Sequence, residues 1–369
     1  MHLSSPDVRF AASSDHADCR MAIQEGSKTF YAASMVLPPK VRQPAYGLYA
    51  FCRMSDDAID LNGGSLQALE RLRERLARVY EGRPLPCAED RAMADLVRDF
   101  GIPRSVPEAL LEGLAWDAQG RRYEKIEDLH DYAARVASTV GVMMSLIMGV
   151  RSTEALARAC DLGTAMQLTN IARDVGEDAR AGRVYLPLSW LREVGLDEQS
   201  FLANPQASDE VKSVVARLLQ EADRLYKKAR QGIAHLPPNC RPAIATAALL
   251  YAEIGRKLER SGLDSINQRA RVSGKRKLAL LAQATLSVPF LSKGLTSAPL
   301  QANAFLVQAV AALPVPVMAP ATVPALADQG FVFTDPLHPQ VLQRQVVSVL
   351  NMFERLERAE QFGKQRRLA

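Results

Sequence analysis

Cysteine is scarce in this chain of 369 residues, which contains only five. They are far apart in the sequence, at Cys19, Cys52, Cys87, Cys160 and Cys240. Their number is odd and no C-x-x-C pair occurs, so the sequence indicates neither a disulfide framework nor a zinc site. The first twenty residues lack the apolar run of a signal peptide. We therefore expect a protein of the reducing cytoplasm.

Aromatic residues are also few, at 6% of the chain, and β-branched alternation bounded by turns is scarce. This composition predicts an all-α fold. The net charge is only +5, and Arg-rich runs such as residues 71–78 alternate with Glu and Leu. Nucleic acid is therefore not an expected partner. Neither a G-x-G-x-x-G fingerprint nor a P-loop occurs, so no NADPH requirement is expected.

Polar residues of one chemical kind recur within residues 163–187. Four of them follow at steps of three, four and four, namely Gln167, Asn170, Asp174 and Asp178. These steps place carboxamides and carboxylates on one face of a helix. Carboxylates on adjacent turns suit Mg²⁺, which completes its octahedron with waters and phosphate oxygens. Arg173, Arg180 and Arg183 lie nearby in the sequence, where they could hold phosphate charge.

A second acidic set occurs upstream, on the predicted helix that carries the sequence AYGLYAFCRMSDDAID. Tyr49, Arg53, Asp56 and Asp60 again share one face, and Asp57 is adjacent. One such face is usually a solvated surface with charge pairs. Two facing sets would repel strongly unless cations were bound between them. The pair therefore predicts a divalent-metal cleft.

The rest of the chain offers weaker signals. Residues 27–29, Ser-Lys-Thr, could hold a phosphate or form an ordinary helix turn. Asp117 has an open role, and a surface or capping carboxylate is at least as good an interpretation as a ligand. Residues 131–150 form a nearly uncharged helix that could pack in the core or border an apolar ligand. The remaining helices are expected near 18–34, 66–79, 90–100, 108–120, 209–235, 241–260 and 278–291, with a short one after 294 and an amphipathic one over 342–356.

Four stretches together resemble the squalene and phytoene synthase family, and its bacterial members most. They are SKTFYAAS followed by LP, LYAFCRMSDDAID, YAARVASTVG and QLTNIARDVGEDARAGRVYLP. The resemblance covers residues 18 to 291. It implies one all-α isoprenoid-synthase domain around a central cavity, over 18–293. Residues 1–17 would be a flexible tail, and 294–369 a Pro/Ala-rich linker with a C-terminal amphipathic helix.

The resemblance also implies roles for single residues. The catalytic carboxylates would be Asp56, Asp60, Asp174 and Asp178. The metal ligands would be the same four with Asp57 and Asn170. The residues matching positions that contact substrate are Gly26, Ser27, Lys28, Thr29, Tyr49, Arg53, Gln167, Asn170, Arg173 and Tyr251. Some relatives have histidine where this chain has Gly26, so a contact there would come from the backbone.

The implied reaction is head-to-head condensation of two geranylgeranyl diphosphates to phytoene through prephytoene diphosphate, in carotenoid biosynthesis. Mg²⁺ is the implied cofactor; bacterial members are also described with Mn²⁺ and ATP dependence. The alternatives are a C30 synthase using farnesyl diphosphate, which makes squalene or dehydrosqualene, and a silent relative acting as an assembly protein. The uncharged stretch 294–327 contains too many prolines to span a membrane. The tail could instead give peripheral contact with the inner membrane face or with carotenoid-pathway enzymes.

Overall fold

The computed structural model describes residues 9–60, 66–291 and 298–313, and these residues form helices and no strand. This confirms the predicted all-α class. The α-helices are Ser13–Gly26 (α1), Lys28–Ser34 (α2), Pro39–Asp60 (α3), Leu66–Tyr80 (α4), Ala88–Phe100 (α5), Ser105–Ala118 (α6), Ile126–Ala133 (α7), Thr139–Ile147 (α8), Thr153–Arg180 (α9), Leu188–Glu193 (α10), Glu198–Ala203 (α11), Asp209–Ile233 (α12), Arg241–Arg260 (α13), Gly274–Ser287 (α14) and Ala304–Ala311 (α15). A π-helix, Ala134–Ser138 (η1), joins α7 to α8, and the 3₁₀ turns Val288–Phe290 (η2) and Gln301–Asn303 (η3) lie near the end of the described chain.

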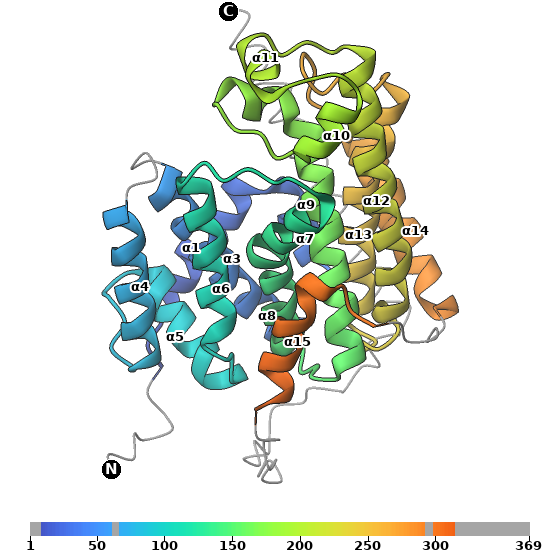
Figure 1. Cartoon of the computed structure of the whole chain (residues 1–369). Helices are drawn as coiled ribbons and strands as arrows, with labels where there is room; N and C mark the ends of the chain where they lie inside the picture. Colours follow the sequence, from blue (N-terminus) through green and yellow to red (C-terminus); the bar gives the residue numbers. More distant parts are fainter. Residues whose placement is uncertain (1–8, 61–65, 292–297, 314–369) are drawn as a thin grey trace, which may run out of the picture.

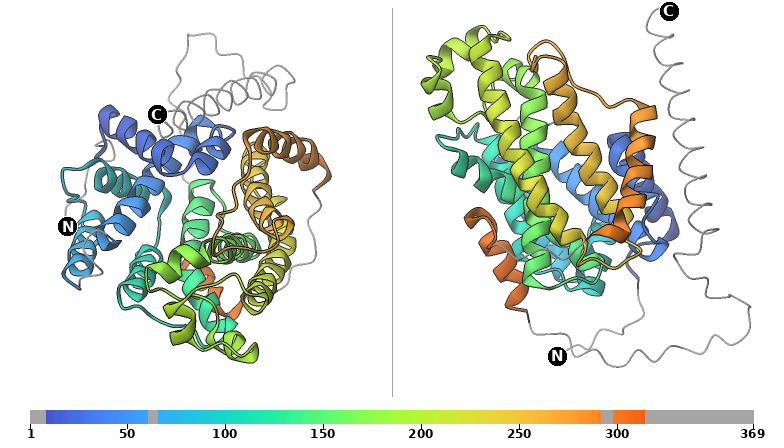
Figure 2. Two further views of the ribbon diagram at one scale, coloured as in Figure 1. Left: turned by 90° about the horizontal axis from the view of Figure 1, so that it is seen from above. Right: turned by 90° about the vertical axis from the view of Figure 1, so that its right-hand side faces the viewer.

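The helix α9 occupies the middle of the molecule (Figures 1 and 2). It packs along α12 and also against η1, α8 and α13, while α3 packs against α1 and α5 on the other side. The sequence of α12 explains its position, because Val211, Val215, Leu218 and Leu225 recur at helical spacing and are buried. The upper ends of α9 and α12 extend to the short helices α10 and α11 (Figure 1).

The helix is interrupted between α1 and α2, where a continuous helix over 18–34 was predicted. Ser27 has an extended backbone, with φ −148° and ψ 95°. Its hydroxyl accepts a hydrogen bond from the backbone N–H of Phe30 at 3.2 Å, so Ser27 caps α2. A second boundary also differs, because α3 begins at Pro39 and contains Pro44 rather than starting after it. Both helix boundaries were therefore predicted wrongly from the sequence.

The expected long helix over 131–150 is divided into three pieces. Residues 126–133 are α-helical, residues 134–138 form the π-helix η1, and α8 follows. A π-helical turn contains one residue more than an α-helical turn and is rare. Contacts with neighbouring helices must therefore stabilise it. Gly113 of α6 and Gly163 of α9 allow this approach, because a Cβ on Gly113 would lie 2.6 Å from Val136 Cγ1 and one on Gly163 would lie 2.8 Å from the backbone of Ala137.

Beyond α14, a short apolar helix was predicted after residue 294, and α15 confirms it. It packs on α6, α8 and α9. The predicted linker after 313 and the amphipathic helix over 342–356 lie outside the described residues. Within the described ranges, no helix combines the length and apolar character needed to cross a membrane.

Candidate active site

An apolar cavity of about 330 Å³ lies among α2, α3, the η1–α8 segment, α9, α12 and α13. Its walls are mostly Ala, Leu, Ile, Met and Val side chains. One end is lined by residues such as Met148, Leu236 and Ala243, near the start of α9 and α13 and the end of α12. The other end is bordered by Tyr49 and Tyr251. The first end is mostly apolar but includes Arg158, which pairs with Asp161. We call the end bordered by the two tyrosines the polar end.

The acidic face of α9 continues the cavity wall. Gly163, Gln167 and Asn170 line the cavity. Asp174 and Asp178 follow on the next two turns of the same face. The Oδ1 atom of Asn170 is buried and has no hydrogen-bond partner. An unpaired acceptor inside an apolar pocket is costly unless a ligand or ion satisfies it.

The acidic face of α3 continues the opposite wall in the same way. Ala45, Tyr49 and Cys52 line the cavity, and Asp56 lies one turn beyond Cys52. The helix faces that carry the two acidic motifs thus both border the polar end of the cavity. Asp60 is in the last turn of α3, but its side chain lies outside the described part of the chain.

The first acidic face is paired with an arginine on its own helix. Arg53 contacts Asp57 at 2.6 Å and Asp56 at 3.6 Å. All three side chains are about half exposed. Arg53 and the two carboxylates are therefore accessible to a ligand entering the polar end of the cavity.

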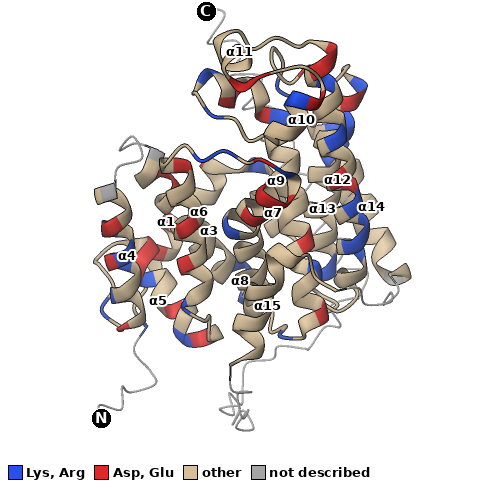
Figure 3. Cartoon of the chain, in the orientation of Figure 1, with Lys and Arg blue, Asp and Glu red and all other residues tan. Residues whose placement is uncertain are grey.

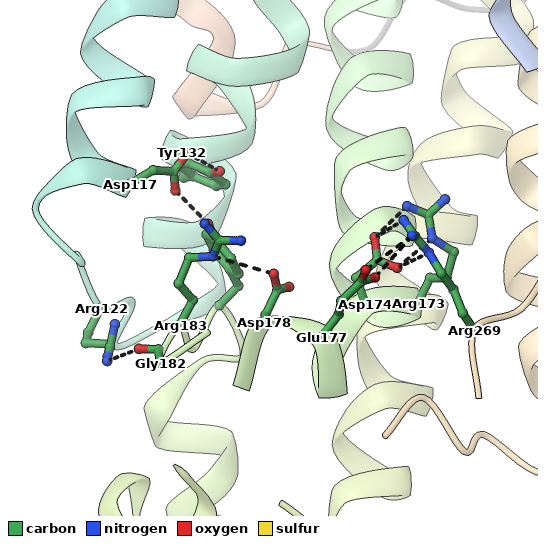
Figure 4. A network of polar contacts seen from close by, with 11 residues as sticks. Asp117, Arg122, Tyr132, Arg173, Asp174, Glu177, Asp178, Gly182, Arg183 and Arg269 are labelled. Atoms are coloured by element: carbon green, nitrogen blue, oxygen red, sulfur yellow. Dashed lines mark hydrogen bonds and ion pairs between the residues drawn. The ribbon is translucent and has the colours of Figure 1, made fainter. Parts of the chain in front are cut away.

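Asp174 is held by two arginines (Figure 4). Arg173 Nε donates to it at 2.8 Å, and Arg269 Nε lies 3.0 Å from it. Arg269 also contacts the carboxylate of Glu177 at 3.2 Å. Arg269 belongs to a basic run in the sequence, residues 269–277, and no motif singled it out. In the structure it lies beside the second acidic motif.

Gly176 explains how the loop carrying Arg269 reaches α9. Its backbone N–H donates to the carbonyl of Ser265 at 3.0 Å. A Cβ at this position would lie 2.2 Å from the carbonyl oxygen of Ile266, which is backbone and cannot turn aside. The glycine between the two aspartates therefore permits the contact that brings Arg269 to Asp174.

The surroundings of Asp178 disfavour the ionised form of its carboxyl group. Its side chain is only 17% exposed, and burial raises its pKa to about 7. Arg183, 3.7 Å away, opposes this shift, whereas the charges of Asp174, Asp117 and Glu177 add to the rise in pKa. A carboxyl in this environment is readily ionised when a cation is bound beside it.

Asp117, whose role the sequence left open, belongs to a hydrogen-bonded network near the second acidic motif (Figure 4). It accepts hydrogen bonds from the hydroxyls of Tyr185 at 2.7 Å and Tyr132 at 2.8 Å. Burial raises its pKa to about 6, the two tyrosines and Arg183 oppose the rise, and the charge of Asp56 adds to it. Asp117 thus interacts electrostatically with Asp56 on α3 and with Asp178 on α9. Tyr185 is a site residue that the sequence did not single out.

The predicted substrate-contact residues near the α1–α2 break also lie at the polar end. A Cβ on Gly26 would lie 2.3 Å from the Tyr49 hydroxyl, so this backbone touches a cavity residue. Phe30 lines the cavity and lies against Tyr251, with ring centroids 5.1 Å apart. Lys28 is exposed and Thr29 is half-buried, while the Ser27 hydroxyl is used in the helix cap. The roles of these residues remain predictions.

The donor set at the polar end fits a divalent cation that is shared with a ligand. Among the described residues, no three His, Cys, Asp or Glu side chains converge on one metal position. Asn170, Asp174 and Asp178 nevertheless offer hard oxygen donors on three successive turns, and the Asn170 oxygen lacks a partner. Mg²⁺ normally takes one or two protein carboxylates and fills its remaining positions with water and phosphate oxygens. The residues present fit that mode better than a cage made of protein alone.

Tyr185→Phe tests whether the tyrosine–Asp117 network sets the titration of the site. Without the 2.7 Å hydrogen bond to the carboxylate, the pKa of Asp117 should rise above about 6. The acid side of the kcat profile should then move to higher pH, by roughly one unit or less. Tyr123→Phe is the matched control, because Tyr123 stacks on Tyr185 but its buried hydroxyl has no hydrogen-bond partner. Equal shifts in both variants would contradict this role.

The helical body, the apolar cavity and the two carboxylate faces at one end define an isoprenoid synthase. Solved structures share the fold. A dehydrosqualene synthase superposes with a TM-score of 0.69 at 31% identity, covering 75% of this chain and 97% of that one. A squalene synthase from Alicyclobacillus acidocaldarius gives a TM-score of 0.61 at 25% identity, covering 68% and 94% of the two chains.

The chain belongs to the squalene/phytoene synthase family, whose sequence pattern matches residues 23–276. It is 50% identical over 279 residues to the phytoene synthase of Rhodobacter capsulatus, covering 75% of this chain and 82% of the relative. It is 48% identical over 315 residues to the phytoene synthase of Cereibacter sphaeroides, covering 81% and 89%. The family resemblance carried by the four sequence stretches is confirmed.

Proposed function

We propose that this prenyltransferase condenses two molecules of geranylgeranyl diphosphate head to head to phytoene, through prephytoene diphosphate, in carotenoid biosynthesis. The observation that carries the proposal is that two carboxylate-bearing helix faces continue into the walls of one apolar cavity. Such a site separates the charged and the apolar halves of a prenyl diphosphate. Identity of about half to two phytoene synthases favours the C40 product over a C30 product.

The polar end would bind the two diphosphate groups. Asp56, Asp174 and Asp178, with the Asn170 oxygen, would hold Mg²⁺ or Mn²⁺, and Asp57 and Asp60 extend the first motif. A bound divalent cation supplies positive charge that favours departure of diphosphate from an allylic carbon. Arg53, Arg173 and Arg183 lie beside the carboxylates and would neutralise the remaining phosphate charge. ATP dependence is not part of the proposal.

The apolar walls would protect the reacting carbons from water. After the first C–O bond breaks, the cation at C1 is captured by the double bond of the second molecule, and proton loss closes the cyclopropane of prephytoene diphosphate. Departure of the second diphosphate, rearrangement and loss of another proton give phytoene. The released diphosphate is a suitable proton acceptor. The rings of Phe30 and Tyr251 lie beside this path and can stabilise positive charge through their faces.

The protein would work in the cytoplasm with peripheral contact at the inner membrane face. Leu286 and Phe290 are 73% and 87% exposed near the end of α14 and in η2. The same helix begins with Lys275, Arg276 and Lys277, and basic residues follow this side of the molecule (Figure 3). A helix that carries basic residues at one end and exposed apolar side chains at the other suits an anionic lipid surface, from which an apolar substrate tail could enter.

The test is incubation of the purified protein with farnesyl or geranylgeranyl diphosphate, with and without Mg²⁺ and NADPH, and identification of the hydrocarbon. We expect phytoene from the C20 substrate with Mg²⁺, no requirement for NADPH, and loss of product when the cation is chelated. A C30 hydrocarbon formed preferentially from the C15 substrate would replace the proposal by its alternative. No hydrocarbon from either substrate would support a silent relative.

A further inference from the structure

Residues 298–311, called the strap below, follow the region that the family pattern matches. They pack into the body of the protein rather than trailing from it. Leu306 and Asn303 are completely buried, and Val307 and Val310 are nearly so. The strap contacts α6, α7, α8, α9 and the π-helix η1 through η3 and α15. The folded body therefore extends past residue 293, the predicted end of the synthase domain.

One end of the π-helix is held by an aromatic residue of the strap. The guanidinium of Arg135 lies over two rings, 4.3 Å from the centroid of Trp116 and 5.3 Å from that of Phe305. Arg135 also pairs with Glu112 at 3.0 Å and donates to the carbonyl of Asp131 at 3.0 Å. Phe305 thus covers an arginine whose backbone belongs to the π-helical turn.

The other end of the π-helix is held by a buried polar chain. Asn303 Nδ2 donates to Thr164 Oγ1 at 3.4 Å, and the hydroxyls of Thr164 and Ser138 lie 3.0 Å apart. The Ser138 hydroxyl donates to the carbonyl of Cys160 at 2.8 Å. Asn303, Thr164 and Ser138 are completely buried. A chain of buried hydrogen bonds of this kind fixes the relative position of its elements, because breaking any member leaves an unpaired polar group.

The π-helix in turn forms part of the cavity. Val136 and Ala137 line the apolar wall, and Val140 and Gly141 continue it into α8. Tyr132, which donates to Asp117, lies just before the π-helical turn. A one-residue change from π to α register would rotate everything on one side of the turn relative to the other by about 100°, since an α-helix has 3.6 residues per turn. The register of η1 therefore determines both the position of the Val136–Ala137 wall and the position of the Tyr132 hydroxyl.

We propose that the strap holds the π-helical turn in register and that Asn303 and Phe305 are positioning residues for the condensation. Neither residue lines the cavity, so each acts through η1. Without them, the wall beside the reacting carbons becomes mobile, and water can capture a cation that should be captured by the second substrate. This inference rests on the proposed condensation, and it assigns a function to a segment beyond the family pattern.

The experiment compares full-length Asn303→Ala and Phe305→Leu with Val310→Ala. Val310 is buried at the far end of α15 and provides a packing control, while Phe305 is only half-buried, so Phe305→Leu should fold even if Asn303→Ala does not. Circular dichroism first sets a temperature at which the variants tested are folded. Hydrocarbon, prephytoene diphosphate and prenyl alcohol are then measured against diphosphate released. We expect the hydrocarbon yield per diphosphate to fall about 10-fold, within the loss that a small misplacement of reacting groups can cause, and Val310→Ala to keep the wild-type ratio.

A wild-type product ratio in folded Asn303→Ala or Phe305→Leu would overturn the strap inference. An equal change in Val310→Ala would also overturn it, because the effect would then reflect general packing. Failure of the proposed function would look different, since the wild-type protein itself would form no C40 hydrocarbon. In that case, the ultraviolet difference spectrum of tyrosine, which responds to the surroundings of Tyr132, should still change in Asn303→Ala and not in Val310→Ala.

Discussion

Asp178→Asn is expected to slow hydrocarbon formation severely and at the same time to stabilise the metal-free protein. The carboxylate is one of three charged groups proposed to hold the cation, and asparagine offers a neutral oxygen in its place. A loss of roughly 10²–10³ in kcat is the range found when one preorganised electrostatic contact is removed. The rate loss should persist at saturating Mg²⁺ if Asp178 acts in the transition state rather than only in binding.

The stability gain follows from the direction of the pKa shift. Burial raises the pKa of Asp178 to about 7, above its unfolded value near 3.8. Between those two pH values the folded state binds more protons than the unfolded state, so the free energy of unfolding falls as pH rises. The full penalty is present above about pH 7, where it amounts to about 4 kcal/mol at most. Asparagine carries no charge and therefore has no such ionisation penalty, so the Tm of the variant should exceed that of the wild type at pH 8.

The measurement is a thermal melt of both proteins at pH 5 and pH 8 in chelator, followed by the same melts with Mg²⁺ and pyrophosphate. The difference in Tm should be larger at pH 8 than at pH 5, and the ligands should stabilise the wild type more than the variant. Glu177→Gln is the matched control, because Glu177 is the adjacent carboxylate on α9 and is 58% exposed. An Asp178→Asn variant with normal activity would remove Asp178 from the proposed cation site.

The acidic faces could be predicted from the sequence because helical periodicity alone places their members. Asp174 and Asp178 share a face with Asn170 and Gln167 in any helix, whatever packs around it. The same holds for Asp56 and Tyr49 on α3. The apolar cavity was implied by the family resemblance, because the uncharged helix over residues 131–150 could equally have packed in the core. Helical periodicity predicts which residues share a face within one helix, but it does not predict contacts between helices.

The other parts of the site depend on tertiary contacts and carry no such local signal. Asp117 looks like any surface carboxylate until the hydroxyls of Tyr132 and Tyr185 are seen to meet it. Arg269 lies 95 residues from Asp174 in the sequence and reaches it because Gly176 lets a loop approach. The glycine between the two aspartates was the one available clue. No sequence signal indicated the π-helix, because its residues are compatible with an α-helix. Contacts with α6, α9 and the strap impose its register.

Neutralising either acidic face is expected to weaken binding of a cation–diphosphate pair at the other. Asp56→Asn alters α3 and Asp178→Asn alters α9, and Asp117 is coupled electrostatically to both positions. If cations and one diphosphate are shared across the cavity, each single variant should bind Mn²⁺ with pyrophosphate at least ~10-fold more weakly, which is about 1.4 kcal/mol. The double variant should then lose less than the sum of the two, because the second change affects a site that is already broken.

Calorimetric titration of Mn²⁺ with inorganic pyrophosphate into the wild type, the two single variants and the double variant measures this coupling directly. The predicted result is a large loss in each single variant with clear non-additivity in the double-mutant cycle. Losses that simply add, or a single variant that binds as the wild type does, would mean that the carboxylates of α3 and α9 serve separate purposes.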